Sequence, residues 1–168
     1  VANTSERFGI KLYKQYFNFG SAHFLIFADG TREELHGHNY RATLELDAPL
    51  DDAHLVADFL VVKPIFKDVC DSLDHRTLIP LGNPHLDVSE TETEVTIRYR
   101  DDRYVIPRRD VRLLDIENTA SELLAKHICT AFMGRLRDEL PNIALSRVQV
   151  TVEESPGQSA VYELRFGA

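Results

Sequence analysis

An alternation of polar and apolar residues over positions 36–47 constrains the fold of this chain more than any other feature. Two histidines, His36 and His38, lie two positions apart, and the following residues of the same parity are apolar: Tyr40, Ala42, Leu44 and Leu46. Because successive side chains of a strand point to opposite faces, this pattern predicts a half-buried strand with both imidazoles on its inward face. At about 3.3 Å per residue the two rings would lie roughly 6.6 Å apart, close enough to converge on one metal ion.

A third histidine, His23, ends another strand-like run over residues 11–24, which is rich in aromatic side chains. A connection over residues 24–35 would fold this run back antiparallel and bring His23 beside the pair. Three neutral imidazoles with a vacant fourth position are typical of a catalytic zinc site. From spacing alone, a metal site and a set of hydrogen-bonded core histidines both remain open.

The rest of the chain predicts two helices and further strands. Residues 62–73 carry a helical apolar stripe, with Pro64 expected in the first turn, and a second helix is expected from a capping box at residues 119–122 to Leu140. Between them, alternation on both sides of residues 101–103 predicts a hairpin inserted within residues 84–112. Two final strands are expected at residues 147–154 and 160–166.

Length and composition limit the class of protein. With 168 residues, 43% of them hydrophobic, the chain is expected to form one domain over residues 1–168. The net charge of -8 argues against a nucleic-acid surface. No apolar run reaches membrane-spanning length and the start of the sequence lacks a signal-peptide layout, so a cytoplasmic location is expected. Cys70 and Cys129 fall in helical patterns and are interpreted as buried hydrophobes rather than a disulfide.

Glu154 has the parity of three inward valines, Val148, Val150 and Val152. An acid in this position is either the first residue to leave the sheet or a carboxylate directed into a pocket, and the strand pattern leaves both alternatives open.

Several short motifs, in this order, carry a resemblance to a known family: Ser21-Ala22-His23-Phe24, His36-Gly37-His38-Asn39-Tyr40, Asp58-Phe59, Leu73-Asp74-His75, and Glu154 followed by Tyr162. The chain resembles the 6-pyruvoyltetrahydropterin and 6-carboxytetrahydropterin synthases over nearly its whole length. The resemblance implies the α+β tunnelling fold, with a four-stranded antiparallel sheet and two helices on one face. It also implies a homo-oligomeric barrel, a hexamer of the family type, with active sites between subunits.

The resemblance further implies zinc-dependent lyase activity on 7,8-dihydroneopterin triphosphate or a related pterin. His23, His36 and His38 would hold the zinc ion. Glu154 would anchor the pterin by accepting two hydrogen bonds side by side. Ser121 lies where the family also contacts the pterin, although a serine at a helix start can equally be a cap. Asp74 and His75 match the family's proton-relaying pair, in which the carboxylate orients the imidazole.

The sequence departs from the family at one important position. Most members have a cysteine base four residues before the first histidine of the His-Gly-His motif, and this chain has Arg32 there. Glu33 instead matches a variant class with a glutamate base, whose product can be 6-hydroxymethyl-dihydropterin. The alternatives are that Glu33 is a solvated loop acid, and that the protein binds zinc and a pterin but has lost or changed the chemistry.

A cupin-type metal enzyme would require a glutamate three or four residues after the second histidine, and this chain has Arg41 and Ala42 there. The sequence therefore argues against that class.

Candidates for binding the phosphates of the substrate are Arg32, Arg76 and Arg108.

Overall fold

The long strand β3 (His36–Asp47) organises the main sheet of this computed structural model, which describes residues 6–167. The sheet has seven strands in the order β10-β9-β3-β2-β4-β8, and β1 (Gly9–Leu12) pairs with the far half of β3. The other strands are β2 (Phe19–His23), β4 (Arg76–Pro80), β8 (Val111–Leu114), β9 (Arg147–Ser155) and β10 (Gln158–Arg165). The four strands β10-β9-β3-β2 are antiparallel neighbours, as predicted, while β4 and β8 extend the sheet in parallel. Residues 1–5 and 168 of the expected domain lie outside the described part.

The single strand predicted over residues 11–24 is wrong in its middle. A short 3-10 turn, η1 (Gln15–Phe17), separates β1 from β2, and both strands pair with β3 along the same edge. The turn buries Phe17, whose ring meets that of Phe66 edge-on at 4.9 Å between centroids. Tyr13, which shares its parity, is 71% exposed. Burial of one aromatic ring against a helix therefore overrides the local strand pattern.

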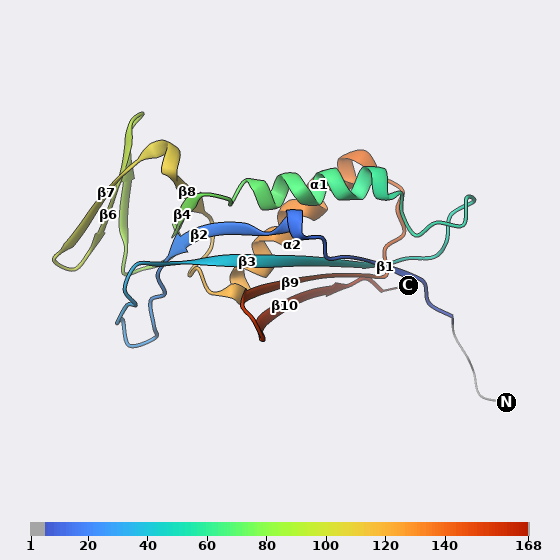
Figure 1. The fold of residues 1–168 in the computed structure, drawn as a ribbon, viewed down its shortest axis with the longest axis horizontal. Coiled ribbons are helices and arrows are strands. Elements are labelled where there is room, and N and C mark those ends of the chain that lie inside the picture. Colours follow the sequence, from blue (N-terminus) through green and yellow to red (C-terminus); the bar gives the residue numbers. More distant parts are fainter. Residues whose placement is uncertain (1–5, 168) are drawn as a thin grey trace.

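Two helices, α1 (Phe59–Asp71) and α2 (Ser121–Glu139), cover one face of this sheet (Figure 1). They enclose the main core between their apolar stripes and the inward residues of β3 and β9, such as Leu44 and Val150. The opposite face of the sheet carries no helix (Figure 1). No helix among the described residues is long and apolar enough to cross a membrane.

Helix α1 starts earlier than predicted. Asp58 is its N-cap, and its carboxylate accepts a hydrogen bond from the Leu60 N–H at 2.7 Å. Pro64 therefore lies inside the helix rather than in its first turn. The missing N–H of Pro64 deprives the Leu60 carbonyl of its helical partner, and Leu60 is 75% exposed at that turn, so the loss falls on the solvent side. The cap thus determines the helix start more strongly than the proline does.

The inserted segment forms a separate three-stranded sheet rather than only a hairpin. β6 (Glu94–Tyr99) and β7 (Asp102–Pro107) make the predicted hairpin, and β5 (Asp87–Glu90) adds a third strand beside β6. The segment returns to the main sheet through a 3-10 turn, η2 (Arg108–Asp110). A second hydrophobic cluster lies under this sheet and joins it to the end of β2: Phe24, Ile26, Ile79, Val95, Ile97, Tyr99 and Val111.

Candidate metal centre

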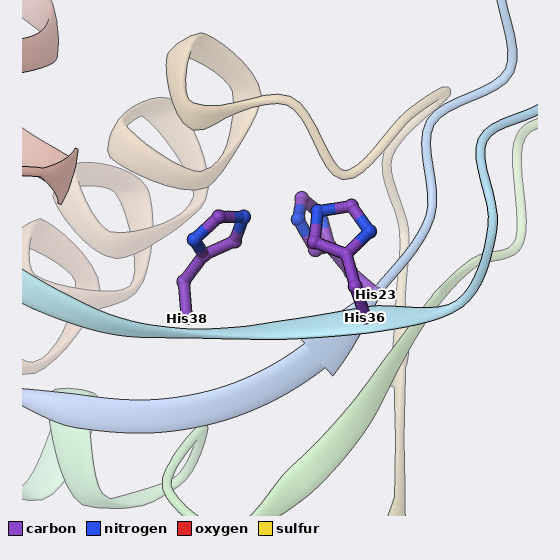
Figure 2. Close-up of side chains that lie close together, drawn as sticks. All are labelled: His23, His36 and His38. Atoms are coloured by element: carbon purple, nitrogen blue, oxygen red, sulfur yellow. The ribbon is translucent and has the colours of Figure 1, made fainter.

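Three histidines meet where β2 ends and β3 begins. His23 and His36 are cross-strand partners, and His38 follows two residues along β3. Figure 2 shows the three imidazoles on the same side of these strands, facing the segment that leads into α2. One ring nitrogen from each lies within 4.8 Å of the others. Zinc bound at about 2.0–2.1 Å would hold its nitrogen ligands somewhat closer together, so small ring rotations would complete the set.

The second ring nitrogens show that this donor set suits a metal ion. Nδ1 of His23 lies 3.2 Å from the Thr119 carbonyl oxygen, and Nδ1 of His36 lies 2.8 Å from the Glu34 carbonyl oxygen. A carbonyl oxygen can only accept, so each Nδ1 carries the hydrogen and each Nε2 keeps its lone pair. Such backbone partners orient metal-ligating histidines and select their tautomer. The residues present therefore fit a divalent metal such as zinc.

The electrostatics of His23 favour the same state. Burial lowers the pKa of this imidazole, the charge of His36 lowers it further, and the charge of Glu154 opposes both only in part. His23 is thus neutral at neutral pH, which is the form that binds metals. Its 3.4 Å approach to the Glu154 carboxylate is consequently not an ion pair under these conditions.

Tyr40 is a site residue that the sequence pattern placed only among the apolar positions of β3. Its side chain is fully buried, and its hydroxyl lies 3.1 Å from Nε2 of His23, to which it donates. Burial raises the pKa of Tyr40 strongly, with further contributions from the negative charges of Glu154 and Glu33. The phenol therefore stays protonated and is a hydrogen-bond donor inside the site. Its position two residues after His38 was the available signal.

Thr119 is a second residue whose role the sequence did not reveal. The predicted capping box does not form, because α2 begins at Ser121 with Ala120 as its N-cap and without a side-chain cap. The Thr119 hydroxyl instead donates to the Phe24 carbonyl at 3.0 Å and lies 3.3 Å from Nδ1 of His23. This hydrogen bond to Phe24 joins residues 95 positions apart, so the Thr119 side chain holds the end of β2 instead of capping α2.

Glu154 takes the inward alternative. Its Oε1 lies 3.4 Å from Nε2 of both His23 and His38, so the carboxylate borders the space between the imidazoles. The side chain is 27% exposed, which leaves it reachable from solvent. A carboxylate beside the three imidazoles can accept hydrogen bonds from a molecule that enters next to the metal position.

Ser121 opens α2 two residues after Thr119. Its hydroxyl oxygen is buried and has no hydrogen-bond partner among residues 6–167. Because a buried hydroxyl without a partner is costly, this group has spare capacity to donate or accept. It is therefore not the cap that its position in the sequence allows.

Glu33 lies on the segment that joins β2 to β3. Its N–H donates to the Leu25 carbonyl at 2.9 Å, and its carboxylate accepts from the Leu25 N–H at 3.2 Å. The side chain is partly buried rather than solvated, and its charge contributes to the raised pKa of Tyr40. The neighbouring Arg32 points to the inserted sheet instead, where it pairs with Asp102.

Asp74 and His75 lie beside β2 at Gly20. The Gly20 N–H donates to the Asp74 carboxylate, and the His75 N–H donates to the Gly20 carbonyl, both at 2.7 Å. Because successive residues of a strand point to opposite faces, Gly20 points to the helix-free face and His23 to the helix side. An open pocket beside the pair is lined mainly from the helix-free face, by Gly20, Ala22, Gly37 and Asn39, and His38 also reaches it. The pair therefore borders an open surface, whereas the His23 ring is buried.

The pair itself has the geometry of an oriented imidazole. His75 Nδ1 is 2.8 Å from the Asp74 carboxylate, and 85% of the His75 side chain is exposed. Burial alone would raise the pKa of Asp74, but hydrogen bonds from the Gly20 N–H and from His75 lower it overall. His75 also adopts a φ of +53°, in the left-handed region, and such strain in a residue other than glycine concentrates at functional sites.

The three arginines proposed for phosphates have different surroundings. Arg32 and Arg108 are engaged with acids, at 2.6 Å to Asp102 and 2.7 Å to Glu90. Arg76 lines the open pocket beside His75. Arg32 and Arg76 each lie next to a candidate site residue, Glu33 and His75, but only Arg76 borders an open pocket.

Comparison with known proteins identifies the same fold and family. The model of the 6-pyruvoyl tetrahydropterin synthase family matches residues 11–165. A Methanocaldococcus jannaschii protein, provisionally named 6-carboxy-5,6,7,8-tetrahydropterin synthase, is 33% identical over 86% of this chain and 88% of its own.

Solved structures agree with this result. The crystal structure of 6-pyruvoyl tetrahydropterin synthase from Plasmodium vivax is 29% identical, with a TM-score of 0.88 over 96% of this chain and all of the other. A variant of the Plasmodium vivax enzyme, 28% identical over the same shares of the two chains, has alanine in place of a glutamate described as its catalytic residue. Sequence and structure together show that this chain belongs to the 6-pyruvoyl tetrahydropterin synthase family, with the tunnelling fold.

Proposed function

We propose that this protein is a zinc-dependent lyase that acts on 7,8-dihydroneopterin triphosphate or a related pterin. The observation that carries the proposal is the cluster of His23, His36 and His38, in which two tautomers are set by backbone carbonyls and the buried ring is neutral. Zinc held there would act as a Lewis acid on the oxygens of the substrate side chain and lower the cost of removing an adjacent proton.

The pterin ring is recognised by the residues beside this cluster. The Glu154 carboxylate accepts hydrogen bonds from the pterin amino group and the adjacent ring N–H. The unpartnered Ser121 hydroxyl supplies a further hydrogen bond at the start of α2. With the lone pair of His23 Nε2 bound to the metal, the Tyr40 hydroxyl would donate to the substrate instead.

Glu33 is the base in this proposal. Its partial burial, its hydrogen bond from the Leu25 N–H and its electrostatic influence on Tyr40 support a place beside the imidazoles. The catalytic glutamate of the similar Plasmodium vivax enzyme supports the same role. A carboxylate base in place of a thiolate would take the substrate proton onto one of its two oxygens.

The Asp74–His75 pair completes the site from a neighbouring subunit. The family is oligomeric, and the pair borders an open pocket lined mainly by residues of the helix-free face, Gly20, Ala22, Gly37 and Asn39. In the assembly, the pair of one subunit would relay protons at the metal centre of the next, with Asp74 holding the His75 ring. The exposure of His75 supports a role toward another molecule rather than within the protomer.

The test is a single incubation with product identification. The purified zinc-loaded protein is expected to convert dihydroneopterin triphosphate to a new pterin, identified by chromatography and mass spectrometry. Glu33→Gln is expected to lower kcat about 10²- to 10⁴-fold, the usual contribution of a general base, while zinc content is retained. The matched control is Glu34→Gln, the exposed acid next to it. Tight pterin binding without turnover by the unmodified protein would select the binding-protein alternative and refute the enzymatic proposal.

A further inference from the structure

The segment that carries Glu33 is a narrow hairpin rather than a free loop. Ile26 and Arg32 form an antiparallel bridge, the Phe27 N–H donates to the Thr31 carbonyl at 2.8 Å, and the Glu33 N–H donates to the Leu25 carbonyl at 2.9 Å. Gly30 turns the chain with a φ of +78°, which is open to glycine at no steric cost. Because this hairpin continues directly from β2, its position determines where the Glu33 carboxylate lies.

Arg32 joins this hairpin to the inserted sheet. Its guanidinium donates to the Asp102 carboxylate of β7 at 2.6 Å and to the backbone carbonyl of Glu33 at 2.7 Å. The side chain is only 13% exposed. The guanidinium lies 5.5–5.8 Å from the ring centroids of three aromatic residues, Phe24, Tyr99 and Tyr104, which is the range of cation–π contacts.

The tip of the hairpin is held by the same sheet. The carbonyl oxygen of Gly30 accepts hydrogen bonds from the Tyr99 hydroxyl and, at 3.0 Å, from the Arg100 guanidinium. The inserted sheet therefore contacts the hairpin at two places, at Gly30 and at Arg32. These contacts link segments about 70 residues apart in the sequence.

From these contacts we propose that Arg32 is a positioning residue for Glu33, and that the inserted sheet β5-β6-β7 is the scaffold against which Arg32 holds it. Neighbouring residues of an extended segment point to opposite faces. Arg32 can therefore be anchored in the aromatic pocket while Glu33 points the other way, toward the Leu25 N–H. The direct bond from Arg32 to the Glu33 carbonyl transmits this anchoring to the backbone of the base.

The inference rests on the proposed function, and a double-mutant cycle tests the catalytic part of it. Arg32→Met keeps the apolar stem and removes the guanidinium; it is expected to lower kcat about 10- to 100-fold with little change in KM, because small displacements of a reacting group are costly. In a Glu33→Gln background the same substitution is expected to change the residual rate less than about twofold. Arg32→Lys keeps the charge but cannot reach both acceptors, so partial activity is expected. Equal losses in both backgrounds would overturn the positioning role.

Hydrogen–deuterium exchange tests the same claim without activity. Peptides that cover residues 25–35 are expected to exchange at least about fivefold faster in Arg32→Met, because the hydrogen bonds of Arg32 to Asp102 and to the Glu33 carbonyl are lost. The matched control is Arg103→Met, which removes an equal charge from an exposed position of β7. Asp102→Asn is a second variant at a half-exposed position, with a smaller effect of the same sign expected. Identical exchange in the Arg32 and Arg103 variants would refute the inference.

The two proposals fail in different ways. If the unmodified protein turns over no pterin, the proposed function fails, and the exchange comparison alone decides whether Arg32 holds the Glu33 segment. If the unmodified protein is active and the double-mutant cycle is additive, the lyase stands and the positioning role of Arg32 falls.

Discussion

The proposed assembly of each active site from the imidazoles of one protomer and the Asp74–His75 pair of its neighbour makes a quantitative prediction about subunit mixing. If each active site combines the imidazoles of one protomer with the pair of its neighbour, then two inactive variants can restore each other. His36→Ala destroys the metal centre of its own protomer, and His75→Ala destroys only the relay that it offers to the next. In an assembly of both, some sites receive an intact half from each variant.

The size of the recovery follows from the geometry. In a randomly mixed one-to-one assembly, half of the metal centres come from His75→Ala protomers and are intact, and half of the neighbours are His36→Ala protomers that supply an intact pair. The expected rate is therefore about one quarter of that of the unmodified protein for a closed ring of identical interfaces. Sites built within one protomer would give no recovery, because every protomer lacks one half.

The assay is turnover of dihydroneopterin triphosphate by the two variants alone and after joint refolding or co-expression with different tags. A matched control mixes His36→Ala with His38→Ala, where every metal centre lacks a ligand and no recovery is expected. If the first mixture is no more active than its components although mixed assemblies have formed, the assignment of the pair to a neighbouring subunit is wrong. Recovery in the control mixture would equally contradict the assignment of the three imidazoles to one protomer.

Three further predictions concern single side chains. Thr119→Val should weaken zinc affinity about 10-fold in chelator competition, because it removes a partner of His23 and such outer contacts typically contribute that much; Thr119→Ser should restore it. Glu154→Gln should weaken pterin binding by about 1.5–3 kcal/mol in a fluorescence titration, the range for a hydrogen bond to a charged group, with zinc content unchanged. The pKa of His127 is lowered by burial and then by the charge of Arg112. Below about pH 6.5 this histidine binds a proton more readily in the unfolded chain than in the folded protein, so acidification should lower the Tm, and lower it less in His127→Gln. An equal dependence of Tm on pH in the two proteins would contradict this.

Local periodicity was sufficient for most of the fold. The alternation in β3 and β9, the apolar stripes of the two helices and the turn between β6 and β7 each place residues within about ten positions of one another. Such patterns report which face of an element is buried. The alternation in β3 therefore predicted that His36 and His38 share the inward face, and the alternation in β9 limited Glu154 to two alternatives. These patterns do not report where burial against another element interrupts the pattern, as it does at Phe17 between β1 and β2.

The amino-acid sequence by itself determined the two helices, the four central strands, the β6–β7 hairpin, the three candidate ligands and the resemblance to the family. Only the tertiary structure decided which groups meet: Thr119 contacts His23 instead of capping α2, Tyr40 enters the site, and Asp74 accepts from the Gly20 N–H of β2. It also brought the inserted sheet into contact with the segment that carries Glu33, because Arg32 bonds to Asp102, 70 residues further along the chain. The physical reason is that hydrophobic spacing acts along one element, whereas these contacts depend on how separate elements pack together.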